Sequence, residues 1–225
     1  TATETYGDIN TWDVSAITDF SSLFVNKTTF NSDISNWDVS SGTDFRYMFF
    51  NAAEFNQDIG SWDVSSGINF GYMFTGASAF DQNIGDWDVS SGTNFDGMFN
   101  GASAFNQDIG SWGVSSGTDF RYMFYNADAF NQDITSWEVD ANANLNNMFE
   151  GADLMQSNQQ FSSTPKSSDF NKKLPTYTVT LSASSIAEGG TLKTSIKTTD
   201  VPNNTILYWS LSGDDIDSCL LYTSD

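Results

Sequence analysis

Histidine is absent from the 225-residue sequence, and cysteine occurs once, at Cys219. Without histidine, the chain has neither the usual general acid–base residue near neutral pH nor the commonest metal ligand. A lone cysteine forms no internal disulfide and no cysteine zinc cluster. No run approaches the roughly 20 apolar residues of a membrane span. We therefore expect no enzyme and no transmembrane segment.

Basic residues are also scarce. The chain carries 29 acids against 8 bases, for a formal net charge of -21. Residues 1–156 hold 22 acids and only three bases, namely Lys27, Arg46 and Arg121. An acidic surface repels phosphate backbones, so we expect no nucleic-acid partner. The same surface suits a salty or calcium-rich medium, or cationic partners.

A repeat of constant length dominates what is present. "FNQDIGSWDVSS" at 55–66 returns as "FNQDIGSWGVSS" at 105–116. Tryptophan occupies every twenty-fifth position without a slip, at Trp12, Trp37, Trp62, Trp87, Trp112 and Trp137. Columns of isoleucine, valine, phenylalanine and methionine keep the same step. A constant spacing of this length is typical of repeat units that bury their apolar faces by stacking on one another.

Each unit combines two patterns. The segment 55–59 is short and apolar at its ends, which predicts a strand of a parallel stack. In 40–49, a Ser-Gly-Thr run precedes Phe45, Met48 and Phe49, whose spacing predicts one face of a short helix. We therefore predict an α/β repeat solenoid of six coils over residues 1–156. An uncapped first coil would favour end-to-end association.

These motifs resemble a known repeat. The recurring W-D-V-S and M-F-x-x-A-x-x-F signatures are similar to the repeat of about 26 residues in BspA-like bacterial surface proteins, divergent relatives of leucine-rich repeats. The resemblance covers residues 5 to about 155. It implies an exported or cell-surface protein that takes part in adhesion, with a surface protein or glycan as its partner.

The repeat stops after Met155. Residues 157–175 are polar and predict a linker. Alternating residues then follow, and 176–225 resembles a truncated Ig-like or Calx-beta-like β module, part of a β-sandwich. Its last stretch, 218–225, fits no pattern and resembles translated adaptor sequence. Because the chain begins at Thr1, we expect a fragment or a mature segment.

Two acidic columns are candidate metal sites. One contains Asp33, Asp58, Asp108 and Asp133, and the other contains Asp38, Asp63 and Asp88. Calcium could bridge such stacked carboxylates. The alternative, which we favour, is that each Asp accepts a hydrogen bond from a nearby backbone N–H in an Asx-type turn. We accordingly predict no obligate cofactor. The asparagine column and the tryptophan column are expected to be structural.

A variable stripe on the predicted helix is the candidate recognition surface. It comprises Arg46, Tyr47, Phe50, Tyr72, Thr75, Asp96, Asn100, Arg121, Tyr122 and Tyr125. Variable, exposed aromatic side chains on a repeat scaffold are typical of a binding surface. Unselected solvent exposure would produce the same variation. We predict a non-catalytic binding or adhesion module, and the alternative is a structural spacer of a large surface protein.

Overall fold

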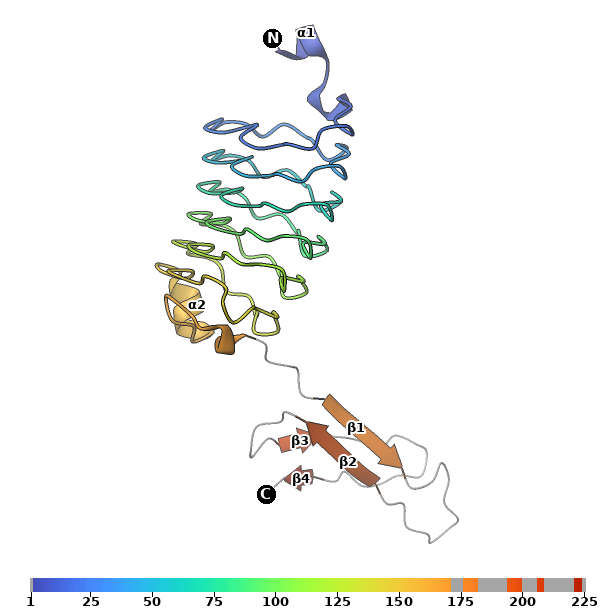
Figure 1. The fold of residues 1–225 in the computed structure, drawn as a ribbon, viewed down its shortest axis with the longest axis vertical. Helices are drawn as coiled ribbons and strands as arrows, with labels where there is room; N and C mark the ends of the chain where they lie inside the picture. The colour runs from blue at the N-terminus through green and yellow to red at the C-terminus, as the bar shows by residue number, and fades with distance from the viewer. Residues whose placement is uncertain (1, 171–175, 182–193, 200–205, 209–220, 224–225) are drawn as a thin grey trace. The chain divides into compact units, whose positions relative to one another are not determined.

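The computed structural model describes residues 2–170, 176–181, 194–199, 206–208 and 221–223. The chain divides into two compact units, Thr1–Lys172 and Lys173–Asp225. In the first unit, six coils of equal length stack on one another (Figure 1). We number these coils from the N-terminus as 5–29, 30–54, 55–79, 80–104, 105–129 and 130–154.

A backbone hydrogen-bond ladder joins neighbouring coils. Phe45, Tyr47, Phe49 and Asn51 each donate an N–H to a carbonyl of coil 3, namely those of Asn69, Gly71, Met73 and Thr75. The four equivalent bonds recur at all five junctions, with N···O distances of 2.7–3.1 Å. Single-residue parallel bridges, such as Asp44 with Asn69, mark the same line. Every donor of this row therefore points toward the C-terminal end of the stack, and every acceptor points toward the N-terminal end.

The predicted helix of each unit is not formed. Residues 46–51 are turns, because the backbone enters the left-handed region at Tyr47 (φ 56°) and again at Asn51 (φ 55°). A left-handed residue every fourth position is incompatible with a right-handed α-helix. The left-handed conformation at these residues leaves alternate N–H groups free to donate to the next coil. The predicted strand at 55–59 also has no ladder, and the bridge lies at position 44 instead.

Aromatic side chains fill the centre of the stack. Phe45, Phe70 and Phe95 are fully buried, and successive rings of this column lie parallel at centroid distances of 5.6 Å. The other phenylalanine columns and the tryptophans stack in the same manner. Burial of each such side chain stabilises the fold by roughly 1.5–3 kcal/mol. The constant spacing in the sequence thus keeps equal side chains in contact from coil to coil.

Each buried tryptophan also bonds the preceding coil. The indole Nε1 of Trp87 donates to the carbonyl of Ile59 at 3.0 Å, and the same bond recurs from Trp37 to Trp137. Trp12 has no such partner in a preceding coil. Its indole bonds the carbonyl of Tyr6, and the side chain is 42% exposed. The expectation that the tryptophan column is core is confirmed for five members and wrong for Trp12.

Residues 157–170 do not form the predicted linker. The short helix α2 (Asp153–Asn158) and the 3₁₀ turn η2 (Ser167–Asp169) lie at the C-terminal end of the stack (Figure 1). Phe161 and Phe170 are buried there, against Phe149 and Trp137 respectively. The two phenylalanines in an otherwise polar stretch were the signal that the linker prediction overlooked. At the other end lie α1 (Ala2–Tyr6) and η1 (Ile9–Thr11).

The described parts of the second unit are four short strands. β1 (Thr176–Leu181) pairs antiparallel with β2 (Thr194–Thr199), and β3 (Ile206–Tyr208) pairs antiparallel with β4 (Leu221–Thr223). The register places Val179 opposite Ile196. These two pairs form separate two-stranded sheets. The Ig-like or Calx-beta-like assignment therefore remains a prediction, and Cys219 lies outside the described residues.

Candidate functional site

The recognition stripe lies on the turn segment that carries the backbone ladder. Its members come from the equivalent positions 46, 47 and 50 of coils 2 to 5. Three of its tyrosines, Tyr47, Tyr72 and Tyr122, have left-handed backbone with φ of 55–57°. In the other coils the same position is held by Ser22, Gly97 and Asn147. A bulky aromatic residue in this region is strained by about 1–3 kcal/mol, whereas glycine and asparagine tolerate it.

The tyrosines form two groups. Tyr47 and Tyr72 stack at 5.0 Å, and Phe50 packs edge-on against Tyr47 at 5.6 Å. Tyr122 and Tyr125 make a similar edge-on pair at 5.8 Å. Gly97 interrupts the tyrosine column between the groups. Tyr47 is 36% exposed, so its ring presents an aromatic surface to solvent.

A polar cluster occupies the interruption. Tyr72 Oη donates to Oδ2 of Asp96 at 2.7 Å, and Arg121 Nη2 lies 3.0 Å from the same oxygen. Arg121 also forms a two-pronged ion pair with Asp119, through Nε and Nη2. The cluster joins three consecutive coils. Its arginine is committed to two carboxylates, which leaves it less available to a ligand than the stripe prediction assumed.

Asp96 departs from the prediction most clearly. It was expected on an exposed stripe, but it is only 5% exposed, and its Oδ1 has no hydrogen-bond partner among the described residues. Burial raises the pKa of Asp96, against the opposing effects of Tyr72 and Arg121. Burial, followed by the hydrogen bond to Asp96, raises the pKa of Tyr72 above its usual range. Asp96 is buried because Gly97, which has no side chain, lets the Tyr72 ring cover the carboxylate.

The remaining stripe residues occupy the predicted positions of their coils, but these positions lie on turns and not on a helix. Arg46 is exposed and pairs with Asp44 at 2.9 Å. The Thr75 hydroxyl donates to the Gly97 carbonyl at 2.6 Å, and Asn100 is half-buried. Asp44 and Asp119, which pair with Arg46 and Arg121, lie outside the predicted stripe. An acid two residues before each arginine was the signal that could have identified them.

The acidic columns make the hydrogen bonds of Asx-type turns. Oδ1 of Asp33, Asp58 and Asp108 accepts the N–H two residues later at 2.9–3.0 Å. Asp133 does the same with Thr135. Oδ1 of Asp38, Asp63 and Asp88 accepts the N–H of Ser40, Ser65 and Ser90. The bonds that the turn interpretation predicts are therefore present.

These serines also lower the pKa values of the aspartates in the second column. The hydroxyl of Ser40 and then its N–H lower the pKa of Asp38, and the equivalent serines lower those of Asp63 and Asp88. Within the described residues, no three acids or cysteines are grouped as ligands for a metal ion. Both columns are exposed to solvent. The geometry that is present is that of a turn-stabilising carboxylate.

The asparagine column forms a side-chain ladder, which confirms its expected structural role. Oδ1 of Asn56 accepts the N–H of Asp81 at 3.0 Å and Nε2 of Gln82 at 2.9 Å. Asp81 repeats both contacts with coil 5, so an aspartate serves here as well as an asparagine. The ladder ends at Asn131, whose buried Oδ1 has no partner in the described part of the chain, because α2 follows in place of a seventh coil.

A recess lies where the second acidic column is interrupted. Gly113 replaces an aspartate, and a hollow of about 240 Å³ is bounded by Gly110, Ser111, Ser136 and Glu138. One carboxylate, that of Glu138, and three serines, Ser111, Ser115 and Ser136, border it. The described residues include no helix of the length and apolarity needed to cross a bilayer.

Comparison with known proteins identifies the repeat. A family model described as "Mycoplasma protein of unknown function, DUF285" matches residues 1–91 and, in a second overlapping match, residues 68–163. Comparisons with curated proteins and with solved structures found no match. The two family matches together cover residues 1–163, which include all six coils and the first part of the C-terminal cap. The chain therefore belongs to the DUF285 family of repeat proteins.

Proposed function

We propose that the stack of coils is a non-catalytic binding module of a BspA-like cell-surface protein, and that the tyrosine stripe is its recognition surface. In this proposal the stack is a leucine-rich-repeat-like solenoid without regular helices. Its stiffness holds many weak contacts in register. Partners of suitable chemistry are a surface protein or a glycan, because tyrosine rings offer both stacking faces and hydroxyl groups.

The left-handed backbone of Tyr47, Tyr72 and Tyr122 supports this proposal most directly. The fold does not require tyrosine at this position, since serine, glycine and asparagine occupy it in other coils. Strained residues that the fold could replace at lower cost are typical of functional surfaces. Retention of three strained aromatic residues on one line therefore favours a role in recognition.

The test is a binding screen with a matched variant. Tyr47, Tyr72 and Tyr122 are each changed to asparagine, the residue that coil 6 uses at Asn147. We expect the variant to remain folded, because asparagine relieves the backbone strain, and to lose binding on glycan and surface-protein arrays. Asp38→Asn with Asp63→Asn, on another part of the coil, serves as the control and should bind as the parent does.

The alternative role is a spacer without a ligand of its own. The side-chain ladders and the parallel aromatic stacks favour this role, because they give a stiff rod whatever the surface carries. A spacer would show no ligand in the screen, or ligands whose binding is insensitive to the tyrosine substitutions. Either result would argue against the recognition role of the stripe.

A further inference from the structure

Coils 2 and 5 carry the same ten-residue sequence on the segment that forms the backbone ladder. SSGTDFRYMF occupies residues 40–49 and returns unchanged at 115–124. At the position of the arginine, the other four coils have Ser21, Gly71, Asp96 and Asn146. Since the stack forms with each of these residues, the fold alone does not require arginine at this position.

Each copy forms the same ion pair on the surface. In coil 2, Nε and Nη2 of Arg46 bond the carboxylate of Asp44 at 2.9–3.1 Å. Arg121 bonds Asp119 in the same way in coil 5, at 2.8–3.1 Å. The side chains of the two arginines are 47% and 40% exposed, and those of the two aspartates are 24% and 25% exposed. The two coils therefore present the same charged pair to solvent.

An aromatic pair completes each cluster. Tyr47 meets Phe50 at 5.6 Å with ring planes at 68°, and Tyr122 meets Tyr125 at 5.8 Å and 69°. Both tyrosines have the left-handed backbone described above. The same sequence thus builds the same surface twice. We call Asp44, Arg46, Tyr47 and Phe50 subsite A, and Asp119, Arg121, Tyr122 and Tyr125 subsite B.

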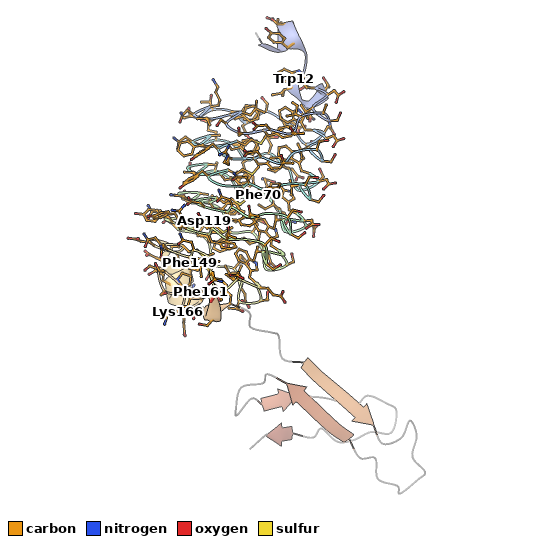
Figure 2. The ribbon with its side chains drawn as sticks, in the orientation of Figure 1. Trp12, Phe70, Asp119, Phe149, Phe161 and Lys166 are labelled. Atoms are coloured by element: carbon orange, nitrogen blue, oxygen red, sulfur yellow. The ribbon has the colours of Figure 1, made fainter. Side chains whose placement is uncertain are left out.

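The ladder fixes the separation of the two subsites. Three successive parallel bridges lead from Asp44 to Asp119, through Asn69 and Asn94. At the usual spacing of paired strands, three steps amount to about 14 Å. Asp119 marks subsite B in Figure 2, toward the C-terminal end of the stack. A ligand that fills both subsites must therefore reach across this distance and present the same chemical group twice.

The backbone of the two subsites is already fully used. In coil 2, the N–H groups of Tyr47 and Phe49 donate to coil 3, and the carbonyls of Asp44 and Arg46 accept from coil 1. The equivalent groups of coil 5 bond coils 6 and 4 in the same way. A peptide that binds by adding a strand needs free groups of this kind. Recognition at the subsites must therefore come from side chains.

Charge narrows the class of ligand further. Residues 1–156 carry 22 acids against three bases, which repels a polyanion. The carboxylates of the subsites are paired with arginine, so they hold no free charge for a polycation. Nη1 of Arg46 and of Arg121 has no partner among the described residues. Donors, acceptors and an aromatic ring side by side match the hydroxyl groups and the C–H faces of a neutral sugar.

We propose that subsites A and B together bind one neutral linear polysaccharide, with a sugar unit against the aromatic pair of each subsite. This inference rests on the recognition role proposed above for the tyrosine stripe, and it names the class of ligand. Each subsite alone binds weakly, because it is open to solvent. A chain that reaches both subsites gains roughly 10²–10⁴-fold in affinity over either one, since the second contact is intramolecular.

The test is isothermal titration calorimetry of the full chain with size-fractionated neutral glucans, mannans and galactans. Short oligosaccharides of the recognised series should bind weakly, two to each protein chain, and long ones tightly, one to each chain. The affinity should rise abruptly once the oligosaccharide spans about 14 Å. A single site would give only a rise in proportion to length. Hyaluronan, a polyanion, should not bind. No binding by any neutral series would overturn the proposal.

Two matched variants remove the subsites one at a time. Tyr47→Asn alters subsite A and Tyr122→Asn alters subsite B, and Asn147 shows that the fold accepts asparagine at this position. Each variant should bind long oligosaccharides roughly 10²-fold or more weakly than the parent and take up one short oligosaccharide instead of two. The abrupt dependence on length should disappear from both. A variant that keeps it would overturn the arrangement of two subsites.

A deletion variant tests the separation itself. Removal of residues 80–104 takes out coil 4, keeps the step of the repeat and leaves both subsites two coils apart. The shortest oligosaccharide that binds tightly should then become shorter by about 4.8 Å, one strand spacing. An unchanged threshold in a folded deletion variant would overturn the proposal. If this variant does not fold, the two point variants decide the matter.

The outcomes separate this inference from the proposed function. A surface protein that binds through the tyrosine stripe, with no polysaccharide bound, would overturn the assignment of the ligand and leave the recognition role in place. If neither a protein nor a polysaccharide binds, both the recognition role and the assignment of the ligand fail.

Discussion

The hydroxyl of Tyr72 lies 2.7 Å from Oδ2 of Asp96 and crosses from coil 3 to coil 4 over a glycine. At Gly97 a Cβ would lie 2.6 Å from two carbons of the Tyr72 ring, so only glycine permits this approach. The contact converts an expected surface acid into a buried one. It also ties the tyrosine stripe to the ion pairs of Arg121.

Asp96→Asn should stabilise the fold at neutral pH. Burial raises the pKa of Asp96 above its ordinary value of 3.8, so the ionised carboxylate opposes folding at pH 7. Asparagine keeps an acceptor for Tyr72 without the charge. We expect a thermal midpoint several degrees higher than that of the parent at pH 7. The difference should shrink as the pH falls through the raised pKa and vanish below about 3.8. A lower midpoint at pH 7 would mean that the attraction to Arg121 outweighs burial.

Gly97→Ala should lower stability by about 1–3 kcal/mol, because a left-handed backbone and the loss of the Tyr72 contact act together. Gly101→Ala is the matched control. Gly101 has a similar φ of +67°, but a Cβ there would meet nothing closer than 3.8 Å. Urea denaturation of both variants separates the two effects. Equal losses would show that backbone strain alone matters and that the Tyr72 ring moves freely.

Trp87→Phe should lower the free energy of unfolding by about 2–4 kcal/mol. The substitution leaves the buried carbonyl of Ile59 without its indole donor and opens space between the neighbouring rings. Trp12→Phe removes the same atoms at a side chain that is 42% exposed. We expect that control to cost less than about 1 kcal/mol in the same denaturation experiment. Similar losses for both variants would contradict the importance of the internal indole bonds.

Asn56→Ala should cost about 1–3 kcal/mol, because the N–H of Asp81 and the amide of Gln82 both lose their acceptor. Asn56→Asp keeps the acceptor and copies what the chain already has at Asp81. Thermal unfolding should rank the parent and Asn56→Asp close together, with Asn56→Ala clearly below. If alanine were tolerated as well as aspartate, the side-chain ladder would contribute little to stability.

Calcium should stabilise the stack no more than sodium does at equal ionic strength. Oδ1 of each column aspartate already accepts a turn N–H, as in Asp38 and Asp63, and the described residues group no three acids around one point. The charge of Asp13 repels that of Asp38, and the charges of Asp38 and Asp88 repel that of Asp63, so salt of any kind should help. The measurement is the thermal midpoint in millimolar calcium and in chelator. A rise specific to calcium would instead indicate ions bound to the native state.

The repeat length and the buried columns could be predicted from the sequence because spacing determines which side chains meet. The fixed step of the repeat places Phe45 on Phe70 whatever the backbone does between them. The local conformation could not be predicted in the same way. Phe45, Met48 and Phe49 have helical spacing, but inter-coil hydrogen bonds outweigh local preference and hold Tyr47 and Asn51 in left-handed turns.

Side-chain exposure at the candidate site was predicted less well than position. The stripe residues were identified as variable, but variability does not distinguish an exposed Arg46 from a buried Asp96. The deciding feature was the absence of a side chain at Gly97, whose effect depends on the ring of another coil. The cap was missed for a related reason, since Phe161 and Phe170 become informative only once the face that they cover is known.

The C-terminal cap makes the unfolding of the described stack directional. Within the described residues, coil 1 contacts a neighbouring coil on one side only, whereas coil 6 is held by coil 5 and by the buried Phe161 and Phe170. In a linear array each unit is stabilised mainly by its neighbours, so fluctuations begin where a neighbour is lacking. Amide protons of the ladder should therefore exchange with solvent fastest at Phe20 and progressively more slowly toward Phe124. Among the six described coils, we therefore expect coil 6, which the cap covers, to open last.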